Sequence, residues 1–448
     1  MFSKILIANR GEIALRIIRA CRELNIRTVA VYSLADRGSL HVQAADEAVC
    51  IGKAPAIQSY LNVSNIISAA LNTGAEAIHP GYGFLAENAY FAELCEANHI
   101  KFIGPDPQVI TIMGDKIAAR KLVTTVGVPV VPGSEGAITE LETAASLAEE
   151  IGYPVMIKAS AGGGGKGMRL AHNRENLKEA LEMARMEAGA AFGNNEIYVE
   201  KYIEEPHHIE IQILGDEQGH MIYLGERDCS IQRRNQKLLE EAPSVLLTDK
   251  MRKQMGETAV KAAQAAGYYS AGTVEFLVDE AKNFYFIEMN TRIQVEHGIT
   301  ELLTGVDLVK EQIKIAAGGT LPYKQEDIHP RGWAIECRIN AEDPHNDFCP
   351  APGTIGTYQP PGGPGVRVDD CVYPGYSIPP YYDSMIAKVM VWAENRPDAI
   401  KRMQRTLKEF QIEGVVTTIP FHLKILENAF FQRGEVYTNF IQRRMQDF

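Results

Sequence analysis

The amino-acid sequence predicts an α/β fold divided among several domains. Its 448 residues suggest two to four domains of roughly 100–200 residues each. An apolar run at residues 4–8 precedes a turn, then apolar residues at helical spacing, and then a second apolar run at residues 28–32. This strand–helix–strand order favours a Rossmann-like parallel sheet with helices packed against it.

The composition excludes several classes of protein. Hydrophobic residues make up 46% of the chain and charged residues 23%, as in ordinary globular domains. Lys and Arg total 45 against 57 Asp and Glu, which gives a formal net charge of −12. Proteins that bind nucleic-acid backbones usually have a basic surplus, so we expect no nucleic-acid partner. Any anionic ligand must instead be bound by locally clustered cations.

Cysteine spacing and hydropathy indicate a cytoplasmic protein. The seven cysteines include no C-x-x-C pair, so neither a zinc site nor a redox dithiol is expected. Charges interrupt the N-terminal residues before a signal-peptide core forms. No apolar run approaches the ~20 residues that a membrane helix needs. We expect no membrane attachment.

Breaks that contain Pro and Gly divide the chain near residues 104–105 and 329–332. Between these breaks we expect helices at residues 116–127 and 140–150 and a strand at residues 153–159. Beyond the second break, strands and Pro/Gly turns give way to helices. The expected domains span residues 1–114, 115–329 and 330–448.

The first segment gives little evidence for a dinucleotide cofactor. Gly11 alone remains of the G-x-G-x-x-G phosphate fingerprint, and Asp36 alone stands near the place of a ribose-binding acid. A second loop, H-P-G-Y-G-F at residues 79–84, follows a strand expected at residues 75–78. Ligands of open α/β sheets bind at such strand ends, so this loop is either a ligand loop or a plain turn.

The most unusual stretch is the glycine run S-A-G-G-G-G-K-G-M-R at residues 160–169. It is not a Walker A loop, because no Ser or Thr follows Lys166, and the strand expected at residues 168–171 replaces the helix of a dinucleotide fingerprint. Glycines let backbone N–H groups approach phosphate oxygens closely, and Lys158 and Arg169 add positive charge. We favour a phosphate-binding loop, with a flexible linker as the alternative.

Two strands expected at residues 272–278 and 284–290 form a hairpin that carries acids. Side chains alternate along a strand, so Glu288 and Asn290 share a face, and Glu275 joins them if it pairs with Glu288 in an antiparallel register. Acids gathered in this way repel one another unless a cation joins them. Mg²⁺ prefers a few carboxylates together with phosphate oxygens, so the hairpin predicts a metal site. Two solvent-facing acids are the alternative.

Directly after the hairpin, residues 291–297 bring further polar groups. If the segment is extended, Arg292, Gln294 and Glu296 point the same way. They would place a fork of donors, an amide and a potential general base beside the metal site. A surface Arg–Glu pair is the alternative. Other local cations lie in residues 200–203, in residues 232–237 and at Arg338.

Several of these motifs together resemble the biotin carboxylase family, within the ATP-grasp superfamily. The resemblance covers nearly the whole chain in order and is strongest to the free-standing bacterial subunit of acetyl-CoA carboxylase. It rests on I-A-N-R-G-E-I-A at residues 7–14, residues 79–84, M-G-D-K at 113–116, residues 160–169, E-R-D-C-S at 226–230, residues 288–297 and P-Y-Y-D-S-M at 380–385.

The resemblance implies a Rossmann-like N-terminal domain, an ATP-grasp domain with a mobile lid at about residues 131–203, and a mixed C-terminal domain. It implies ATP contacts at Lys116, Lys158, Gly164, Gly165, Glu200, Lys201, Tyr202, Ile203, His208, Gln232, Asn235, Glu275 and Glu288. It implies Mg²⁺ or Mn²⁺ ligands at Glu275, Glu288 and Asn290, and a bicarbonate site at Lys237, Arg292, Gln294, Val295 and Glu296. Tyr82 and Arg338 match positions near biotin, and Arg292, Glu296, Lys237 and Arg338 match catalytic positions.

Three residues depart from the family pattern. Asn235 stands where a His is frequent, which puts a nucleotide contact there in question. Gly298 replaces the usual Pro after Glu296-His297, and it predicts a looser turn around the proposed base. Trp333 stands where a His is frequent, and nothing in the sequence assigns it a consequence.

The implied reaction has two stages. Glu296 deprotonates bicarbonate, which Arg292 and Lys237 hold, and the bicarbonate attacks the γ-phosphate of ATP to give carboxyphosphate and ADP. Carboxyphosphate then releases CO₂ and phosphate. The phosphate removes the proton from biotin, and Arg338 stabilises the enolate-like anion. A closed glycine loop would exclude water.

The implied partners are a biotin carboxyl carrier protein, because no M-K-M biotinylation string occurs, carboxyltransferase subunits and a second copy of the chain. Because three domains account for the 448 residues, we expect no carrier module in this chain. A pyruvate- or propionyl-CoA-type assembly with split subunits also remains open. Three other functions remain open as well: an ATP-grasp enzyme such as a carbamoyl-phosphate synthetase, a dinucleotide-dependent oxidoreductase, and a regulatory nucleotide-binding module.

Overall fold

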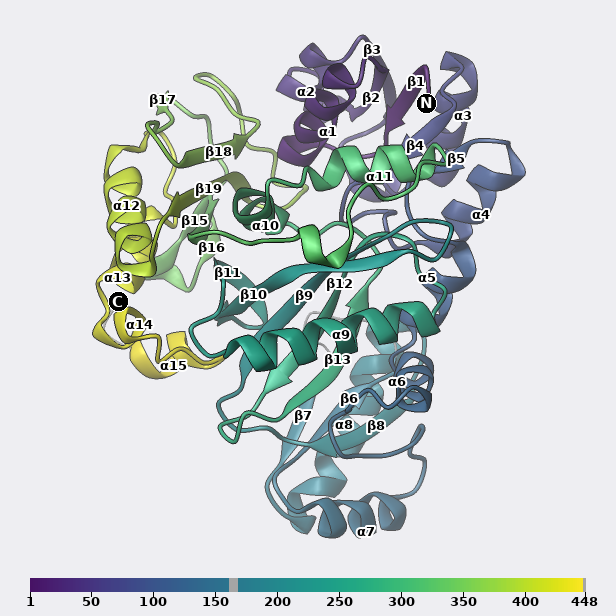
Figure 1. Ribbon diagram of the computed structural model, residues 1–448, viewed down its shortest axis with the longest axis vertical. Coiled ribbons are helices and arrows are strands. Elements are labelled where there is room, and N and C mark those ends of the chain that lie inside the picture. Colours follow the sequence, from purple (N-terminus) through teal and green to yellow (C-terminus); the bar gives the residue numbers. More distant parts are fainter. Residues whose placement is uncertain (161–167, 446–448) are drawn as a thin grey trace.

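The computed structural model describes residues 1–160 and 168–445, and it confirms the α/β fold (Figure 1). Gly164, Gly165 and Lys166 of the predicted phosphate loop lie outside the described residues. Within the described ranges, the strands form a five-stranded, an eight-stranded and a three-stranded sheet and two smaller pairs. No helix in this part of the chain is long and apolar enough to cross a membrane.

The N-terminal segment confirms the predicted strand–helix–strand order. Its strands pair in parallel in the order β3-β2-β1-β4-β5, with β1 at the centre. Alternate residues of β1 enter two different hydrophobic cores, Ile5 and Ile7 on one face and Leu6 on the other, so helices cover both faces. The elements are β1 (Lys4–Ile7), α1 (Gly11–Glu23), β2 (Arg27–Ser33), α2 (Leu40–Ala44), β3 (Glu47–Gly52), α3 (Val63–Thr73), β4 (Ala77–His79), α4 (Ala89–Ala97), β5 (Lys101–Phe102) and α5 (Pro107–Gly114).

A small unit follows, at the bottom of Figure 1. Its sheet has the order β7-β6-β8, in which both neighbours of β6 are antiparallel to it. Residues 131–203, the predicted lid, contain this sheet and two helices that pack on it through Ala144, Ala148, Leu177 and Leu181. The elements of this unit are α7 (Leu141–Ile151), β6 (Val155–Ala159), β7 (Arg169–Ala171), α8 (Arg174–Phe192) and β8 (Ile197–Lys201). Helix α6 (Lys116–Thr125) precedes the unit and packs against the eight-stranded sheet through Ala119 and Val123.

The eight-stranded sheet joins the predicted central and C-terminal domains. Its order is β13-β12-β9-β10-β11-β14-β19-β18, so strands from both sides of the break at residues 329–332 are hydrogen-bonded neighbours. The strands are β9 (His207–Gly215), β10 (Met221–Arg233), β11 (Gln236–Ala242), β12 (Ser270–Val278), β13 (Phe284–Asn290), β14 (Trp333–Asn340), β18 (Val366–Asp370) and β19 (Met385–Ala393).

Helices pack on this sheet and fix the segments that lead to the cavity. One of them, α10, lies against β14 and β19, with Ile299 and Leu303 beside Met390. Two strand pairs, β15 (Glu342–Asp343) with β16 (Cys349–Pro350) and β17 (Tyr358–Gln359) with β20 (Gln411–Ile412), extend the C-terminal segment. The helices are α9 (Asp249–Ala265), α10 (His297–Thr304), α11 (Leu308–Ala316), α12 (Arg396–Glu409), α13 (Ile419–Glu427), α14 (Ala429–Arg433) and α15 (Phe440–Arg444).

The structure gives packing roles to two of the unusual residues. Trp333 donates from Nε1 to Glu241 Oε2 at 2.8 Å and packs against the C-terminal core. Gly298 is buried in the first turn of α10, where an added Cβ would overlap the sulfur atom of Met390. Met390 therefore fills the space beside Gly298, and the looser turn expected there stays a prediction.

Substitution of Gly298 tests this packing. We expect Gly298→Ala to lower the free energy of unfolding by about 1–3 kcal/mol, because overpacking outweighs the gain in helix propensity. In a Met390→Ala background the same substitution should cost less, and chemical denaturation of the four variants of this cycle measures the difference. Additive effects would show that the two side chains do not compete for this space.

Candidate active site

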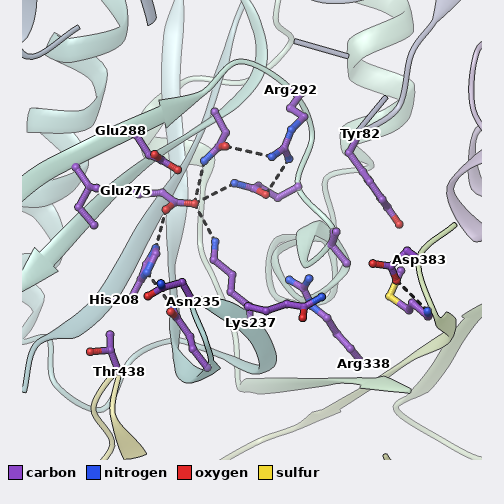
Figure 2. Close-up of a pocket in the computed structure, with 18 of the residues that line it drawn as sticks. Tyr82, His208, Asn235, Lys237, Glu275, Glu288, Arg292, Arg338, Asp383 and Thr438 are labelled. Atoms are coloured by element: carbon purple, nitrogen blue, oxygen red, sulfur yellow. Dashed lines mark hydrogen bonds and ion pairs between the residues drawn. The ribbon is translucent and has the colours of Figure 1, made fainter. Parts of the chain in front are cut away.

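A cavity of about 710 Å³ lies where the N-terminal segment, the small unit and the eight-stranded sheet meet. Figure 2 shows Tyr82, Arg292 and Arg338 on one side and His208, Asn235 and Glu288 on the other. The cavity brings together all the predicted site residues within the described ranges except Glu296, which lies buried behind the wall. These residues are Tyr82, Lys116, Lys158, Glu200, Lys201, Tyr202, Ile203, His208, Gln232, Asn235, Lys237, Glu275, Glu288, Asn290, Arg292, Gln294, Val295 and Arg338.

The acidic hairpin has the expected register. Glu275 on β12 pairs with Glu288 on β13, and Thr273 pairs with Asn290. Asn290 Nδ2 donates to Glu275 Oε1 at 2.9 Å, and Lys116 Nζ lies 3.3 Å from Glu288 Oε2. Two carboxylates and an amide therefore lie close together at the cavity, a donor set that suits a hard divalent cation.

Lys237 binds three carboxylates at once. Its ammonium donates to Glu210 Oε2 at 2.6 Å and to one oxygen each of Glu275 and Glu296 at 2.8 Å. Burial alone would lower the pKa of Lys237, but these three acids outweigh it and raise the pKa well above its usual value. The ammonium thus supplies the cation that lets the acids gather.

The same cations set the proton affinity of the acids. Burial would raise the pKa of Glu275, but Lys237 and His208 outweigh it and lower that pKa well below its ordinary value. Burial would also raise the pKa of Glu296. The charges of Lys237, Arg338 and Arg227 outweigh burial and lower that pKa well below its ordinary value. Glu296 therefore carries a carboxylate that becomes basic only when its cations move toward another anion.

The segment after the hairpin corrects one expectation. It does not continue as an extended strand, because it turns at Val295 and Glu296 and Glu296 becomes the residue before α10. Arg292 Nη1 still donates to Gln294 Oε1 at 2.9 Å at the cavity wall, whereas the Glu296 side chain is 0% exposed. The change of direction follows from helix initiation, which alternation along a strand does not describe.

Two acids that contact the arginines of the cavity were not predicted from the sequence. Glu87 accepts from Arg292 Nε at 2.7 Å, and Glu240 accepts from Arg338 Nε at 2.7 Å. Arg338 also donates to Glu296 Oε2 at 2.9 Å. The alternation of side chains along β11 is the only sequence signal that could have indicated Glu240. No sequence signal indicates Glu87.

The opposite end of the cavity offers cations and amides. Lys158 pairs with Glu200, and Arg120 lies 3.7 Å from the same carboxylate. The ammonium of Lys201 donates instead to the carbonyl groups of Gly152 and Tyr153. Of the two lysines, Lys158 is therefore the one that is paired with a carboxylate. A bound anion could replace that carboxylate as the partner of Lys158.

His208 and the hairpin turn at Asn235 complete this end. His208 Nδ1 lies 2.9 Å from Gln232 Nε2, and its Nε2 lies 2.8 Å from Glu275 Oε2. Arg234 and Asn235 both have positive φ, 50° and 64°, in the tight turn between β10 and β11. Asn tolerates this left-handed conformation, so the turn gives a physical reason for Asn235.

Some predicted cations and acids lie elsewhere. Arg233 and Arg234 both pair with Asp347 outside the cavity, so Lys237 is the cation of residues 232–237 that enters it. Asp36 is buried and binds Arg10 Nε at 2.7 Å. Asp36 therefore holds Arg10, which lines the cavity, and its carboxylate is not free to bind a ribose.

Tyr82 marks the side of the cavity nearest the N-terminal segment (Figure 2). Its hydroxyl donates to Glu12. Burial, followed by the charge of Glu12, raises the pKa of Tyr82 well above its usual value, so the hydroxyl keeps its proton. The loop at residues 79–84 is thus part of the cavity wall, which favours the ligand-loop interpretation.

A small sheet unit that faces a larger sheet across a cavity with lysines and paired acids defines the ATP-grasp class of ligases. Comparison with protein families matches residues 1–110 to the biotin carboxylase N-terminal domain and residues 115–324 to the carbamoyl-phosphate synthase L chain ATP-binding domain. Residues 336–443 match the biotin carboxylase C-terminal domain.

Known proteins align along nearly the full chain. Biotin carboxylase 1 of Bacillus subtilis is 62% identical over 99% of this chain and 98% of its own length. A pyruvate carboxylase subunit of Methanothermobacter thermautotrophicus is 57% identical over 98% of this chain and 90% of its own length. The chain therefore belongs to the biotin carboxylase family, and it is an ATP-dependent carboxylating ligase.

A solved structure has the same architecture. The biotin carboxylase domain dimer of Hydrogenobacter thermophilus 2-oxoglutarate carboxylase, in complex with MgADP, ADP and bicarbonate, superposes with a TM-score of 0.96. It is 56% identical in sequence, and the match covers 99% of this chain and 97% of that one.

The buried Glu240 generates a pH-dependent prediction. Burial, opposed by Arg338, raises the pKa of Glu240 from its ordinary 4.5 to about 7. The folded protein therefore holds this proton in a pH range where the unfolded chain has lost it, so the free energy of unfolding falls as the pH rises through that range. Glu240→Gln cannot ionise and should show a shallower fall.

Thermal unfolding of both proteins across this pH range measures the difference. We expect the melting temperature of the wild type to fall more steeply with increasing pH than that of the variant. Parallel curves would contradict a proton held at Glu240.

Proposed function

We propose that this chain is the biotin carboxylase subunit of an acetyl-CoA carboxylase. It would use ATP and bicarbonate to carboxylate biotin on a biotin carboxyl carrier protein, and carboxyltransferase subunits would then form malonyl-CoA for fatty acid synthesis. The observation that carries the chemistry is the contact of Glu296 with both Lys237 and Arg338 beside the acidic hairpin. We further propose a cytoplasmic homodimer with domains at residues 1–114, 115–329 and 330–448.

In this proposal the nucleotide occupies the end of the cavity near the small unit. Lys116 and Lys158 bind phosphate oxygens, and the segment at residues 200–203 with His208 and Gln232 holds the base and ribose. Glu275, Glu288 and Asn290 fit a divalent cation because their oxygens are hard donors. Mg²⁺ or Mn²⁺ held there would neutralise and orient the phosphates.

Bicarbonate binds at the other end, between Arg292, Lys237 and the residues Gln294 and Val295. Its negative charge draws Lys237 from Glu296, which raises the proton affinity of that carboxylate and lets it act as the base. The bicarbonate oxygen attacks the γ-phosphorus, the bond to the ADP oxygen breaks, and carboxyphosphate forms.

Carboxyphosphate then dissociates to CO₂ and phosphate, and the phosphate takes the ureido proton of biotin. Arg338 stabilises the enolate-like anion, and Tyr82 lies beside it as part of the biotin site. The anion attacks CO₂ to give carboxybiotin. The predicted lid, residues 131–203, excludes water from the reactive intermediates.

ATP hydrolysis measured with and without bicarbonate and biotin tests the assignment. We expect turnover that requires bicarbonate and rises with biotin. Turnover that requires bicarbonate but ignores biotin would favour a carbamoyl-phosphate synthetase type of chemistry and would contradict our proposal. Capture of the carrier protein, followed by assay with acetyl-CoA or pyruvate, distinguishes the acceptor, because one relative is named as part of a pyruvate carboxylase.

The role of Glu296 has a direct test. Glu296→Gln should lower bicarbonate-dependent ATP turnover by about 10²–10⁴-fold, because it removes the base, and should leave nucleotide binding within a few-fold. Glu226→Gln is a matched control, since Glu226 is buried and paired with Arg252 but does not line the cavity. Full turnover in Glu296→Gln would exclude Glu296 as the base.

A further inference from the structure

Lys388 is a buried cation that the reaction described above does not use. It lies on β19 opposite Arg338 on β14, and its side chain is 0% exposed. On the other side of β19, the residue opposite Lys388 in the strand register is Asp369 on β18. A lysine enclosed in this way carries a large desolvation cost, so its contacts require an explanation.

The ammonium of Lys388 joins two walls of the cavity. It donates to the carbonyl oxygen of Val295 at 2.7 Å and lies 3.2 Å from Glu12 Oε1. Glu12 in turn accepts the hydroxyl of Tyr82, and Lys388 Nζ lies 5.9 Å from the centre of the Tyr82 ring. A continuous path of contacts therefore runs from Tyr82 through Glu12 and Lys388 to the turn that holds Glu296.

The surroundings keep Lys388 charged. Burial would lower its pKa, but Glu12, Glu336 and Asp369 outweigh burial and hold the pKa above its ordinary value. Glu336 is itself fully buried, and neither of its carboxyl oxygens has a hydrogen-bond partner among the described residues. Burial raises the pKa of Glu336 well above its ordinary value, so Glu12 is the acid that the ammonium contacts directly. The hydrogen bond from Lys388 to Val295 is charge-assisted.

We propose that Lys388 is a positioning residue that couples biotin at Tyr82 to the bicarbonate turn at Val295 and Glu296. Biotin that contacts Tyr82 fixes the Tyr82–Glu12–Lys388 contacts, and these contacts fix the Val295 carbonyl and therefore the Glu296 backbone. Bicarbonate activation then accelerates when biotin is present. This inference rests on the proposed function, because it assigns biotin to the Tyr82 side.

The readout is the ratio of bicarbonate-dependent ATP turnover with saturating biotin to turnover without biotin. This ratio does not depend on the fraction of folded enzyme, so a purely structural role of Lys388 would leave it unchanged. We expect Lys388→Met to lower the ratio by at least ~10-fold and to raise the KM for bicarbonate, while the KM for ATP stays within about two-fold, because a misplaced group costs up to ~10² in rate.

Two further variants keep the inference falsifiable. Glu12→Gln preserves an acceptor for Tyr82 but removes the charge, and it should lower the ratio in the same direction even if Lys388→Met does not fold. Arg396→Met is the matched control, because Arg396 is a buried cation paired with Glu241 that does not line the cavity. It should lower the melting temperature and leave the ratio unchanged.

The possible failures are distinct. A wild-type enzyme without any response to biotin would overturn the proposed function itself. A wild-type response that persists at full size in Lys388→Met, or in Glu12→Gln where the first variant does not fold, would overturn the coupling role of Lys388. A ratio that falls equally in Arg396→Met would also overturn it, because the effect would then follow from general destabilisation.

Discussion

The ammonium of Lys237, in contact with Glu210, Glu275 and Glu296, is the interaction on which the rest of the site depends. Three carboxylates in a buried pocket repel one another, and none can stay ionised there without a cation. Because the Lys237 ammonium is a point charge on a flexible side chain, a bound anion can compete for it. That competition links anion binding to the basicity of Glu296.

The continuous eight-stranded sheet makes this arrangement possible. It places Lys237 and Glu240 on β11 directly beside Arg338 on β14, although about a hundred residues separate these strands in the sequence. The N-terminal segment closes the site from the other side through Tyr82 and Glu12. Each contributor lies on a helix, a strand or a short loop held by packing, which suits groups that must be positioned before the substrate arrives.

Sequence reasoning recovered the parts of this site that depend on local periodicity. The hairpin with Glu275 and Glu288 was predictable in register because strand alternation is a short-range property. Glu87, Glu240 and Lys388 were not, because the residues that they contact lie far away in the sequence. The shared direction of Arg292, Gln294 and Glu296 depended on an extended segment, and nothing local distinguishes a strand end from a helix start at Glu296. The family resemblance supplied biotin, which no residue pattern had indicated.

Transfer of labelled bicarbonate to free biotin by a Lys237→Met variant is the measurement that tests this account most directly. Removal of the ammonium should lower kcat/KM for bicarbonate by roughly 10²–10³-fold, the scale of a lost electrostatic contact to a reacting anion. The affinity for ATP should change by only a few-fold. A variant that transfers label at the wild-type rate would contradict the central role assigned to Lys237.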